Sequence, residues 1–216
     1  MAVRTKARRP RDEARRARTD VYRQHILEAA EQVFAERGFE AAKLQEIGKA
    51  AGLSMGTIYA IFPGKQELYD AILATRGEEL HRLAREAASR DLPPHAALDA
   101  LIELYIDWFL AHPDFLRMHL RSGASWGLGP AAPTDGQIAH WQDIHALQAD
   151  IFRRGIAAGD FVDEDPSYLA RLFSVMDQVL LAEWVAHGMH PERERLVRRL
   201  KAQVARAFSP TTDTSR

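Results

Sequence analysis

Residues 38–73 read GFEAAKLQEIGKAAGLSMGTIYAIFPGKQELYDAIL and predict two short helices separated by a glycine-containing turn. Leu44 and Ile47 mark one apolar face of the first helix. Gly52 follows, where a chain that leaves a helix often needs a positive φ angle. Ser54 then supplies a natural N-cap, because its hydroxyl can accept a hydrogen bond from an unpaired amide of the next helix.

The second of these helices needs support from the rest of the chain. It is expected to span about seven residues, and an isolated helix of that length is not stable in water. Ile58 and Phe62 can anchor it by packing on Val33, Ile47 and Leu53. Two short helices, a turn with glycine and free side chains at the start of the second helix are the parts of a helix-turn-helix.

Apolar residues in the rest of the chain recur at intervals of three and four, which predicts an all-α fold. Ile26, Ala30 and Phe34 show this spacing before Gly38. No stretch alternates with period two, as a half-buried strand would. We expect about nine helices, with uncertain ends, at 20–37, 43–50, 54–60, 64–89, 95–111, 113–121, 135–158, 166–187 and 191–208.

Composition excludes several classes of protein. The chain has 216 residues, of which 46% are apolar, so it can build a core and is not expected to be disordered throughout. It contains no cysteine, which excludes disulfide scaffolds, cysteine-ligated zinc, iron–sulfur clusters and thiol catalysis. No apolar run is long enough to cross a bilayer, and no secretory signal follows the basic N-terminus. We therefore expect a cytoplasmic protein.

Charge is unevenly distributed, although the formal net charge is only −1. Residues 1–75 hold 13 basic and 10 acidic residues, whereas residues 76–216 hold 16 basic and 20 acidic residues. Within residues 1–18 there are eight basic and two acidic residues. Such a segment is either a solvated tail or an arm that neutralises the phosphates of a nucleic acid. Near-neutrality of the whole chain therefore does not exclude a nucleic-acid partner.

The residues of the helix-turn-helix resemble the N-terminal domain of the tetracycline-repressor-like (TetR) family. The resemblance covers residues 20–73, and it rests on the order Gly38-Phe39, Ile47, GLSMGTIY at 52–59, Phe62 and Lys65. It implies a two-fold dimer with a variable C-terminal domain for ligands. The expected divisions are a basic disordered arm (1–18), a helix-turn-helix DNA-binding domain (19–66), a helical ligand-binding and dimerisation domain (67–209) and a flexible tail (210–216).

Position by position, the resemblance assigns DNA contacts to the two short helices and their flanks. Gln45 matches a position from which the family reaches DNA, and its amide can bind adenine in the major groove. Gly56 would let the backbone approach the duplex, and Tyr59 matches a phosphate-binding tyrosine. Ala42 replaces a frequent phosphate-binding threonine, which raises the expected importance of the arginines. The expected DNA-binding residues are Gln45, Ser54, Met55, Gly56, Thr57, Tyr59, Lys65, Arg15, Arg16 and Arg18.

The C-terminal two thirds of the chain is rich in aromatic, histidine and methionine side chains at helical spacing. Many of these are expected to fill an ordinary core, and a subset is expected to line an apolar pocket that a few polar groups make specific. His112, His119 and His145 are the stronger candidates, because a polar side chain among aromatics needs a partner. The candidate ligand-binding residues are Trp108, His112, Met118, His119, Trp126, Trp141, His145 and Met176.

The last two helices carry apolar side chains that either cover their own core or meet a second copy of the chain. In the family that the sequence resembles, the corresponding helices form a four-helix bundle across the dimer axis. Two-fold symmetry also lets two half-sites act as one operator, which favours a homodimer. The candidate interface residues are Leu172, Val179, Leu180, Leu200 and Val204.

Other motifs carry less weight. Residues 123–127 match the G-x-S-x-G nucleophile elbow, but that motif requires a buried strand before it, and helix is expected there. The nine histidines show no zinc-site spacing. We therefore expect no catalytic residue, metal or cofactor.

The sequence favours a ligand-responsive transcriptional regulator, a repressor that an unidentified small molecule releases from a palindromic double-stranded DNA operator. A helical small-molecule-binding protein or enzyme using residues 95–187 is the alternative.

Overall fold

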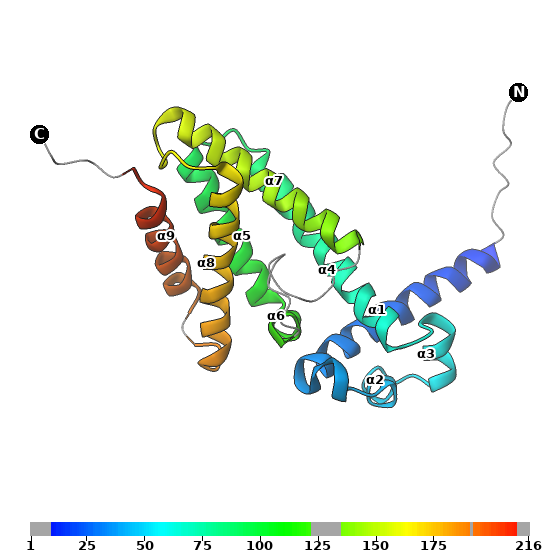
Figure 1. The fold of residues 1–216 in the computed structure, drawn as a ribbon. Coiled ribbons are helices and arrows are strands. Elements are labelled where there is room, and N and C mark those ends of the chain that lie inside the picture. The colour runs from blue at the N-terminus through cyan, green and yellow to red at the C-terminus, as the bar shows by residue number, and fades with distance from the viewer. Residues whose placement is uncertain (1–9, 122–134, 191, 211–216) are drawn as a thin grey trace, which may run out of the picture. The chain divides into compact units, whose positions relative to one another are not determined.

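The computed structural model describes residues 10–121, 135–190 and 192–210, with side chains omitted for residues 10–12 and 135–141. These residues form nine helices and no strand, so the predicted all-α class is confirmed (Figure 1). None of these helices combines the length and the apolar character needed to cross a lipid bilayer. The chain divides into two compact units, one ending at Ile72 and the other beginning at Leu73.

The first unit is built on α1 (Pro10–Ala41), α2 (Leu44–Ala50) and α3 (Met55–Ile61). Ile26, Phe34, Ile47 and Ile58 are fully buried and pack the three helices together. Each of the two short helices is thereby held by neighbours, since helices of one or two turns cannot form alone.

The expected disordered arm is wrong for residues 10–18, which form the first turns of α1. Residues 10–18 contain four arginines, two alanines and one glutamate, all good helix formers. Pro10 is also favourable at the first position of a helix, and Glu13 complements the positive end of the helix dipole. Residues 1–9, and the tail beyond residue 210, lie outside the described part of the chain.

The second unit contains α5 (Pro94–Ala111), α6 (Pro113–Arg121), α7 (Asp135–Ala158), α8 (Pro166–Ala186) and α9 (Arg193–Phe208). Asp165 begins α8 by accepting hydrogen bonds from two backbone amides, those of Ser167 at 2.7 Å and Tyr168 at 2.9 Å. Phe152 packs at the centre, with its ring 4.9 Å from that of Phe208 on α9. Aromatic packing thus joins helices that are far apart in the sequence.

Helix α4 (Lys65–Ala88) belongs to both units, because the division at residue 72 falls within it. The expected domain boundary at residues 66/67 lies six residues earlier. Leu68 and Ile72 are buried in the first unit, and Leu80, Ala84 and Ala87 are buried in the second. One continuous helix therefore contributes core residues to both parts of the molecule.

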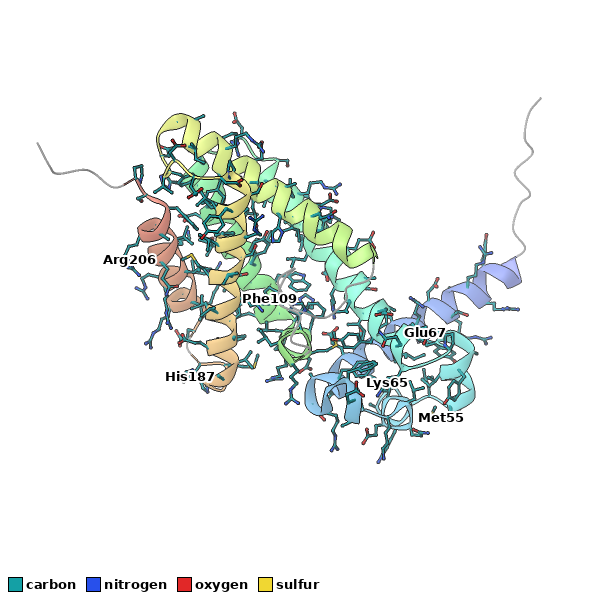
Figure 2. All side chains as sticks on the ribbon, viewed as in Figure 1. Met55, Lys65, Glu67, Phe109, His187 and Arg206 are labelled. Atoms are coloured by element: carbon teal, nitrogen blue, oxygen red, sulfur yellow. The ribbon has the colours of Figure 1, made fainter. Side chains whose placement is uncertain are left out.

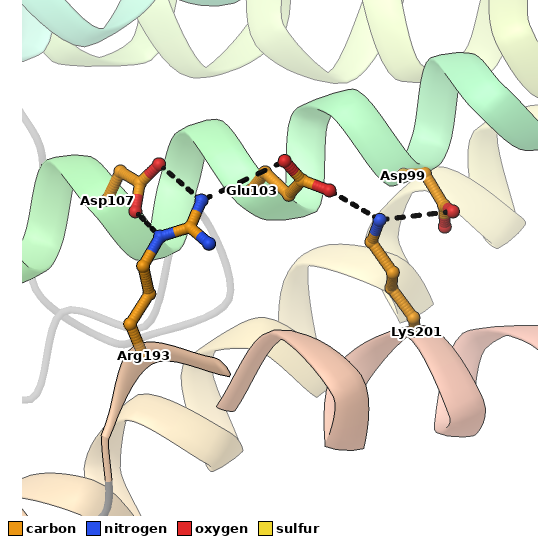
Figure 3. Close-up of polar contacts among 5 residues, drawn as sticks. All are labelled: Asp99, Glu103, Asp107, Arg193 and Lys201. Atoms are coloured by element: carbon orange, nitrogen blue, oxygen red, sulfur yellow. Dashed lines mark hydrogen bonds and ion pairs between the residues drawn. The ribbon is translucent and has the colours of Figure 1, made fainter. Parts of the chain in front are cut away.

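A ladder of charges ties α9 to α5 (Figure 3). Asp99, Glu103 and Asp107 follow one another at intervals of four on one face of α5. Arg193 binds Asp107 through two nitrogens, and the Lys201 ammonium lies 2.6 Å from Glu103 and 3.2 Å from Asp99. These groups are half-exposed, so the ladder fixes the register of α9 more than it adds stability.

Candidate nucleic-acid interface and ligand region

Close contact between α2 and α3 depends on two glycines. Gly52 has a φ of +66° in the turn, a conformation that other residues adopt only with strain. Gly48 lies against α3, and a Cβ atom there would stand 3.2 Å from the Met55 sulfur and 3.4 Å from the Leu53 carbonyl oxygen. These small residues let α3 pack closely on α2, as the sequence predicts for a helix-turn-helix.

Helix α3 presents its early residues and Tyr59 outward while its apolar face is buried. The Ser54 hydroxyl accepts a hydrogen bond from the Thr57 amide at 3.2 Å, which confirms the predicted N-cap. Ile58 and Phe62 are buried, whereas the Tyr59 side chain is 53% exposed. Met55, which Figure 2 labels at the start of α3, is half-buried, with its sulfur close to Gly48 of α2.

Gly56 has no packing reason to be glycine. The nearest atom to a Cβ built there would be the Ser54 hydroxyl at 3.8 Å, so an alanine would fit. Glycine inside a helix costs about 0.5–1 kcal/mol relative to alanine. A helix of only seven residues therefore carries a destabilising residue on its exposed side, which is typical of a place where another molecule approaches the backbone.

The other expected DNA contacts are also accessible. Gln45 is exposed on α2, and the side chains of Arg15, Arg16 and Arg18 are exposed on α1. Sequence analysis missed Arg23, whose guanidinium lies 4.6 Å from the centre of the Phe62 ring. This cation–π contact holds the end of α3 against α1. No local motif signals it, because 39 positions separate the two residues in the sequence.

Lys65 corrects a prediction. Its ammonium donates to the carbonyl oxygens of Phe39 at 2.6 Å, Glu40 at 3.1 Å and Ala42 at 3.3 Å. Phe39 and Glu40 follow a break in α1 at Gly38, whose φ of +77° is not helical, and Ala42 comes directly after the helix. The ammonium has three donors and three acceptors, so Lys65 caps α1 rather than holding a phosphate. Figure 2 shows the residue at the first turn of α4.

The predicted association residues separate into two groups. Leu172 and Val179 are 36% and 57% exposed on α8. Leu180, Leu200 and Val204 are instead buried in the core of their own unit, because α8 and α9 pack together along these side chains. Leu200 and Val204 fill the protomer, which corrects their assignment to an interface, whereas Leu180 is buried but also lines a surface groove between α8 and α9.

The predicted ligand residues also separate. Trp108, Met118 and His119 are buried in the second unit, and the His112 ring contacts Trp108 in a tilted arrangement with centroids 4.5 Å apart. Met176 instead lines a surface groove between α8 and α9, so it is not part of the interior. The segment 122–134, which contains Trp126 and the G-x-S-x-G motif, and the Trp141 side chain lie outside what the structure describes.

A buried polar chain crosses the second unit from α5 to α8. The Ser174 hydroxyl donates to the Gln148 carbonyl oxygen at 3.0 Å, and the Gln148 amide donates to the Tyr105 hydroxyl at 3.3 Å. Two buried polar atoms in the same unit, Trp108 Nε1 and Asp177 Oδ1, have no hydrogen-bond partner among the described residues. Buried polar atoms are normally paired, so each of these two atoms marks a point in the second unit where the described residues leave a polar group without a partner.

Burial changes the protonation of this region. It raises the pKa of the Asp177 carboxyl to about 7 and lowers the pKa of His119 to about 4. The pKa of half-buried His145 is lowered by burial and by the nearby charge of Arg171. Sequence analysis named the histidines but missed Asp177, because nothing in a helical pattern shows that a carboxyl faces the core.

Polar contacts connect α4 with the helices of this region. The His112 ring lies 3.8 Å from the Glu79 carboxylate, which Arg76 also contacts at 3.3 Å. His81, also on α4, is buried and lies 3.7 Å from Asp143 of α7. Changes in α5 or α7 can therefore reach the part of α4 that belongs to the second unit. Over the residues described, no group of three or more potential metal ligands comes together.

Replacing Lys65 by methionine should destabilise the first unit by about 2–3 kcal/mol, since hydrogen bonds to a charged group are lost while the aliphatic stem remains. Chemical denaturation measures this change. Lys49→Met, at an exposed site on α2, should change stability by less than about 0.5 kcal/mol. If Lys65 held a phosphate instead, the substitution would leave stability unchanged and reduce the salt dependence of DNA binding.

Asp177→Asn should remove a pH-dependent cost. The folded state keeps the Asp177 proton up to a pKa of about 7, whereas the unfolded chain loses it near 3.8. The free energy of unfolding of the natural protein should therefore fall as pH rises between these values. The stability of the asparagine variant relative to the natural protein should rise over the same range. Denaturation of both proteins at several pH values tests this. Parallel stability curves would contradict it.

Comparison with known proteins identifies the family of the first unit. The family of bacterial regulatory proteins called tetR matches residues 26–72, which contain α2, α3 and the start of α4. An uncharacterized HTH-type transcriptional regulator, YhgD of Bacillus subtilis (strain 168), is 39% identical over 184 residues. That match covers 85% of this chain and 95% of the relative, so it extends through both units.

Solved structures show the same fold at low sequence identity. A regulatory protein in the tetR family from Rhodococcus RHA1 has a TM-score of 0.75 at 19% identity, covering 87% of this chain and 97% of that one. The regulator FadR from Bacillus subtilis, solved in complex with stearoyl-CoA, has a TM-score of 0.71 at 15% identity, covering 84% and 97%. With the helix-turn-helix and the nearly full-length relative, these findings establish that the chain belongs to the TetR family of bacterial transcriptional regulators.

Proposed function

We propose that this protein is a homodimeric repressor of the cytoplasm, and that a small molecule bound in its second unit releases it from a palindromic operator. The observation that carries the proposal is the geometry of α3. Its apolar face is clamped by α1 and α2, while Ser54, Gly56 and Tyr59 are exposed. Such a helix can enter the major groove and read bases with its early residues. Exposed Gln45 and the arginines of α1 add contacts from the same unit.

An exposed apolar stripe supports dimerisation. Of the five large apolar side chains that are exposed in the described residues, three lie on α8: Tyr168, Leu172 and Val179. Their spacing of four and seven places them on one face of the helix. The groove beside them has a volume of about 430 Å³ and is lined by α8 and α9. A second copy packing there would form an interface in which the same residues meet across the two-fold axis.

The second unit is suited to receive a ligand among α5, α7 and α8. Several buried aromatic side chains and an incomplete polar region lie there, as in sites that bind small molecules. FadR, whose fold is similar, is a regulator with stearoyl-CoA bound. In this chain the ligand would act through Glu79 and His81 on α4, and the continuous helix would carry the change to residues 65–72. The ligand must bind the DNA-free state more tightly than the DNA-bound state.

The alternative is a helical small-molecule-binding protein or enzyme using residues 95–187. Among the described residues of this range, burial and not a neighbouring carboxylate raises the pKa of Asp177, so Asp177 is not half of a carboxyl pair suited to acid–base catalysis. We therefore propose no catalytic role. An enzymatic function of residues 95–187 would also not explain why Ser54, Gly56 and Tyr59 are exposed on α3.

Selection of bound duplexes from random-sequence DNA tests the proposed function. The protein should enrich an inverted repeat whose half-sites are about 34–36 Å apart or somewhat more. A metabolite library added to the selected complex should contain a compound that lowers DNA affinity. Failure to enrich any sequence would contradict operator binding, and enrichment without any releasing compound would contradict ligand control.

Gly56→Ala should separate stability from DNA binding. The variant should be more stable by about 0.5–1 kcal/mol, because alanine is the better helix former. Affinity for the selected duplex should nevertheless fall about tenfold or more, corresponding to about 1.4 kcal/mol of lost contact. Ala60→Gly, on the same helix, should lower stability as a control. An affinity that rises with stability would show that DNA does not approach Gly56.

Replacing Arg15, Arg16 and Arg18 together by alanine should weaken binding to all duplexes and reduce its salt dependence. Each phosphate contact contributes about 0.9 to the slope of log affinity against log salt, so the slope should fall by about 2–3. A triple variant of exposed arginines in the second unit, Arg82, Arg90 and Arg153, serves as the control. An unchanged slope in the α1 variant would exclude these arginines from the interface.

Val179→Glu should produce monomers, because it places a charge at the most exposed residue of the apolar stripe on α8. Light scattering at micromolar concentration should report a dimer for the natural protein and a monomer for the variant. Ala157→Glu, exposed on α7, should remain dimeric. A natural protein that is monomeric would contradict dimerisation, and a variant that is still a dimer would place the interface elsewhere.

A further inference from the structure

Asp177 is a buried carboxyl with an unanswered hydrogen-bonding requirement. Its side chain is only 5% exposed, and its Oδ1 atom has no partner among the described residues. Within the described part of the second unit, it is the one buried aspartate or glutamate. Leaving such an atom unpaired destabilises the folded protein, and does so more strongly if the carboxyl is charged. A folded protein keeps a cost of this kind where the group serves another purpose.

Among the polar groups around Asp177, the unpaired atom is confined to this carboxyl. Phe173 lies one turn earlier on α8, and its ring is 6.5 Å from that of Tyr105 on α5. Ser174, Gln148 and Tyr105 form a complete chain of hydrogen bonds next to it. Asp177 is close enough to Tyr105 that, after burial itself, its charge helps to raise the pKa of the tyrosine. The neighbours are paired with one another, whereas the carboxyl oxygen is not.

Charge in this region favours a positive ligand. No lysine or arginine side chain is buried in the residues that the structure describes. The half-buried arginines of the second unit already have carboxylate partners: Arg76 binds Glu79 at 3.3 Å, Arg117 binds Asp114 at 2.8 Å, and Arg193 binds Asp107. His119 is neutral near pH 7 because burial lowers its pKa to about 4. An anionic group placed beside Asp177 would meet a carboxyl and no buried cation.

We propose that the effector of this protein is an apolar organic cation, whose ammonium group binds the Asp177 carboxylate while its apolar body lies among the rings of Tyr105, Trp108 and Phe173. The inference rests on the proposed function and names the chemical class of its ligand. The aromatic rings contribute through their negative faces as well as by apolar contact. The Trp108 Nε1–H group, which also lacks a partner in the described residues, can donate to an acceptor on the same ligand.

Three probes that differ only in their polar group test the proposal by calorimetric titration of the full-length protein. They are 2-naphthylmethylamine, which is an ammonium ion at pH 7.5, 2-naphthylmethanol and 2-naphthoate. The affinity of the protein for the amine should be about tenfold higher than for the alcohol, or higher still, as expected for one charge-assisted hydrogen bond. The carboxylate should bind most weakly. Equal binding of all three, or no binding of the amine, overturns the proposed ligand class.

Two variants locate the contact. Asp177→Asn should remove the preference for the amine over the alcohol, so that the two bind within about twofold of each other. Asp150→Asn provides the matched control, since Asp150 is an exposed carboxylate on α7 that binds Arg153 at 2.7 Å. It should keep the preference. Loss of the preference in the control, or its survival in Asp177→Asn, would overturn the assignment to Asp177.

Thermal stability distinguishes a ligand-binding carboxyl from a structural one. Asp177→Leu should raise the melting temperature of the ligand-free protein, because it removes an unpaired polar group. Gln148→Leu should lower it, because Gln148 is bonded on both sides. If Asp177→Leu instead lowers the melting temperature as Gln148→Leu does, the carboxyl has a structural role and the proposal is overturned.

The operator assay separates failure of this inference from failure of the proposed function. Each naphthyl probe and, separately, lauroyl-CoA are added to the complex with the selected duplex. If lauroyl-CoA or naphthoate releases the protein from DNA and the amine does not, the proposed ligand-controlled regulator is supported and the cationic effector is overturned. Binding of the amine through Asp177 with no change in DNA affinity would support the site and overturn ligand control. Release by the amine, lost in Asp177→Asn, supports both.

Discussion

The structure depends on the stability of one helix that cannot form by itself. Helix α3 has seven residues and contains a glycine, so its shape comes from its neighbours. Ile58 and Phe62 bury its inner face, and Ser54 caps its start. Lys65 then caps the end of α1, which fixes the chain immediately after α3 onto the helix before α2. The outer face of α3 does not contribute to the packing of the first unit, so it is available to contact DNA.

The second unit shows the opposite balance, with a buried region whose polar groups are not all paired. Its helices are joined by aromatic packing and, at the surface, by the charge ladder between α5 and α9. Asp177 and Trp108 lie inside this frame with atoms that lack partners in the described residues. The same α5 ends at His112, which contacts Glu79 of α4. A ligand that completes the polar region would therefore act close to the helix shared by both units.

Local sequence patterns predicted the fold and the reading helix well. Capping at Ser54, the turn at Gly52 and the ends of most helices depend on neighbouring residues, and the structure confirms them within a few positions. Long-range contacts were not predictable in this way. The acceptors of Lys65 lie 23 to 26 residues before it. Periodicity showed that Leu200 and Val204 share an apolar face, but it could not show that the same protomer covers that face.

Site-specific photocrosslinking tests the central claim that the exposed face of α3 meets DNA. A photoreactive phenylalanine analogue in place of Tyr59, which is 53% exposed, leaves the buried face of the helix intact. With the duplex selected from random DNA, this protein should form a protein–DNA adduct, and the same analogue at exposed Ala157 of α7 should not. An adduct from position 157 in the absence of one from position 59 would contradict the account, because DNA would then bind the second unit.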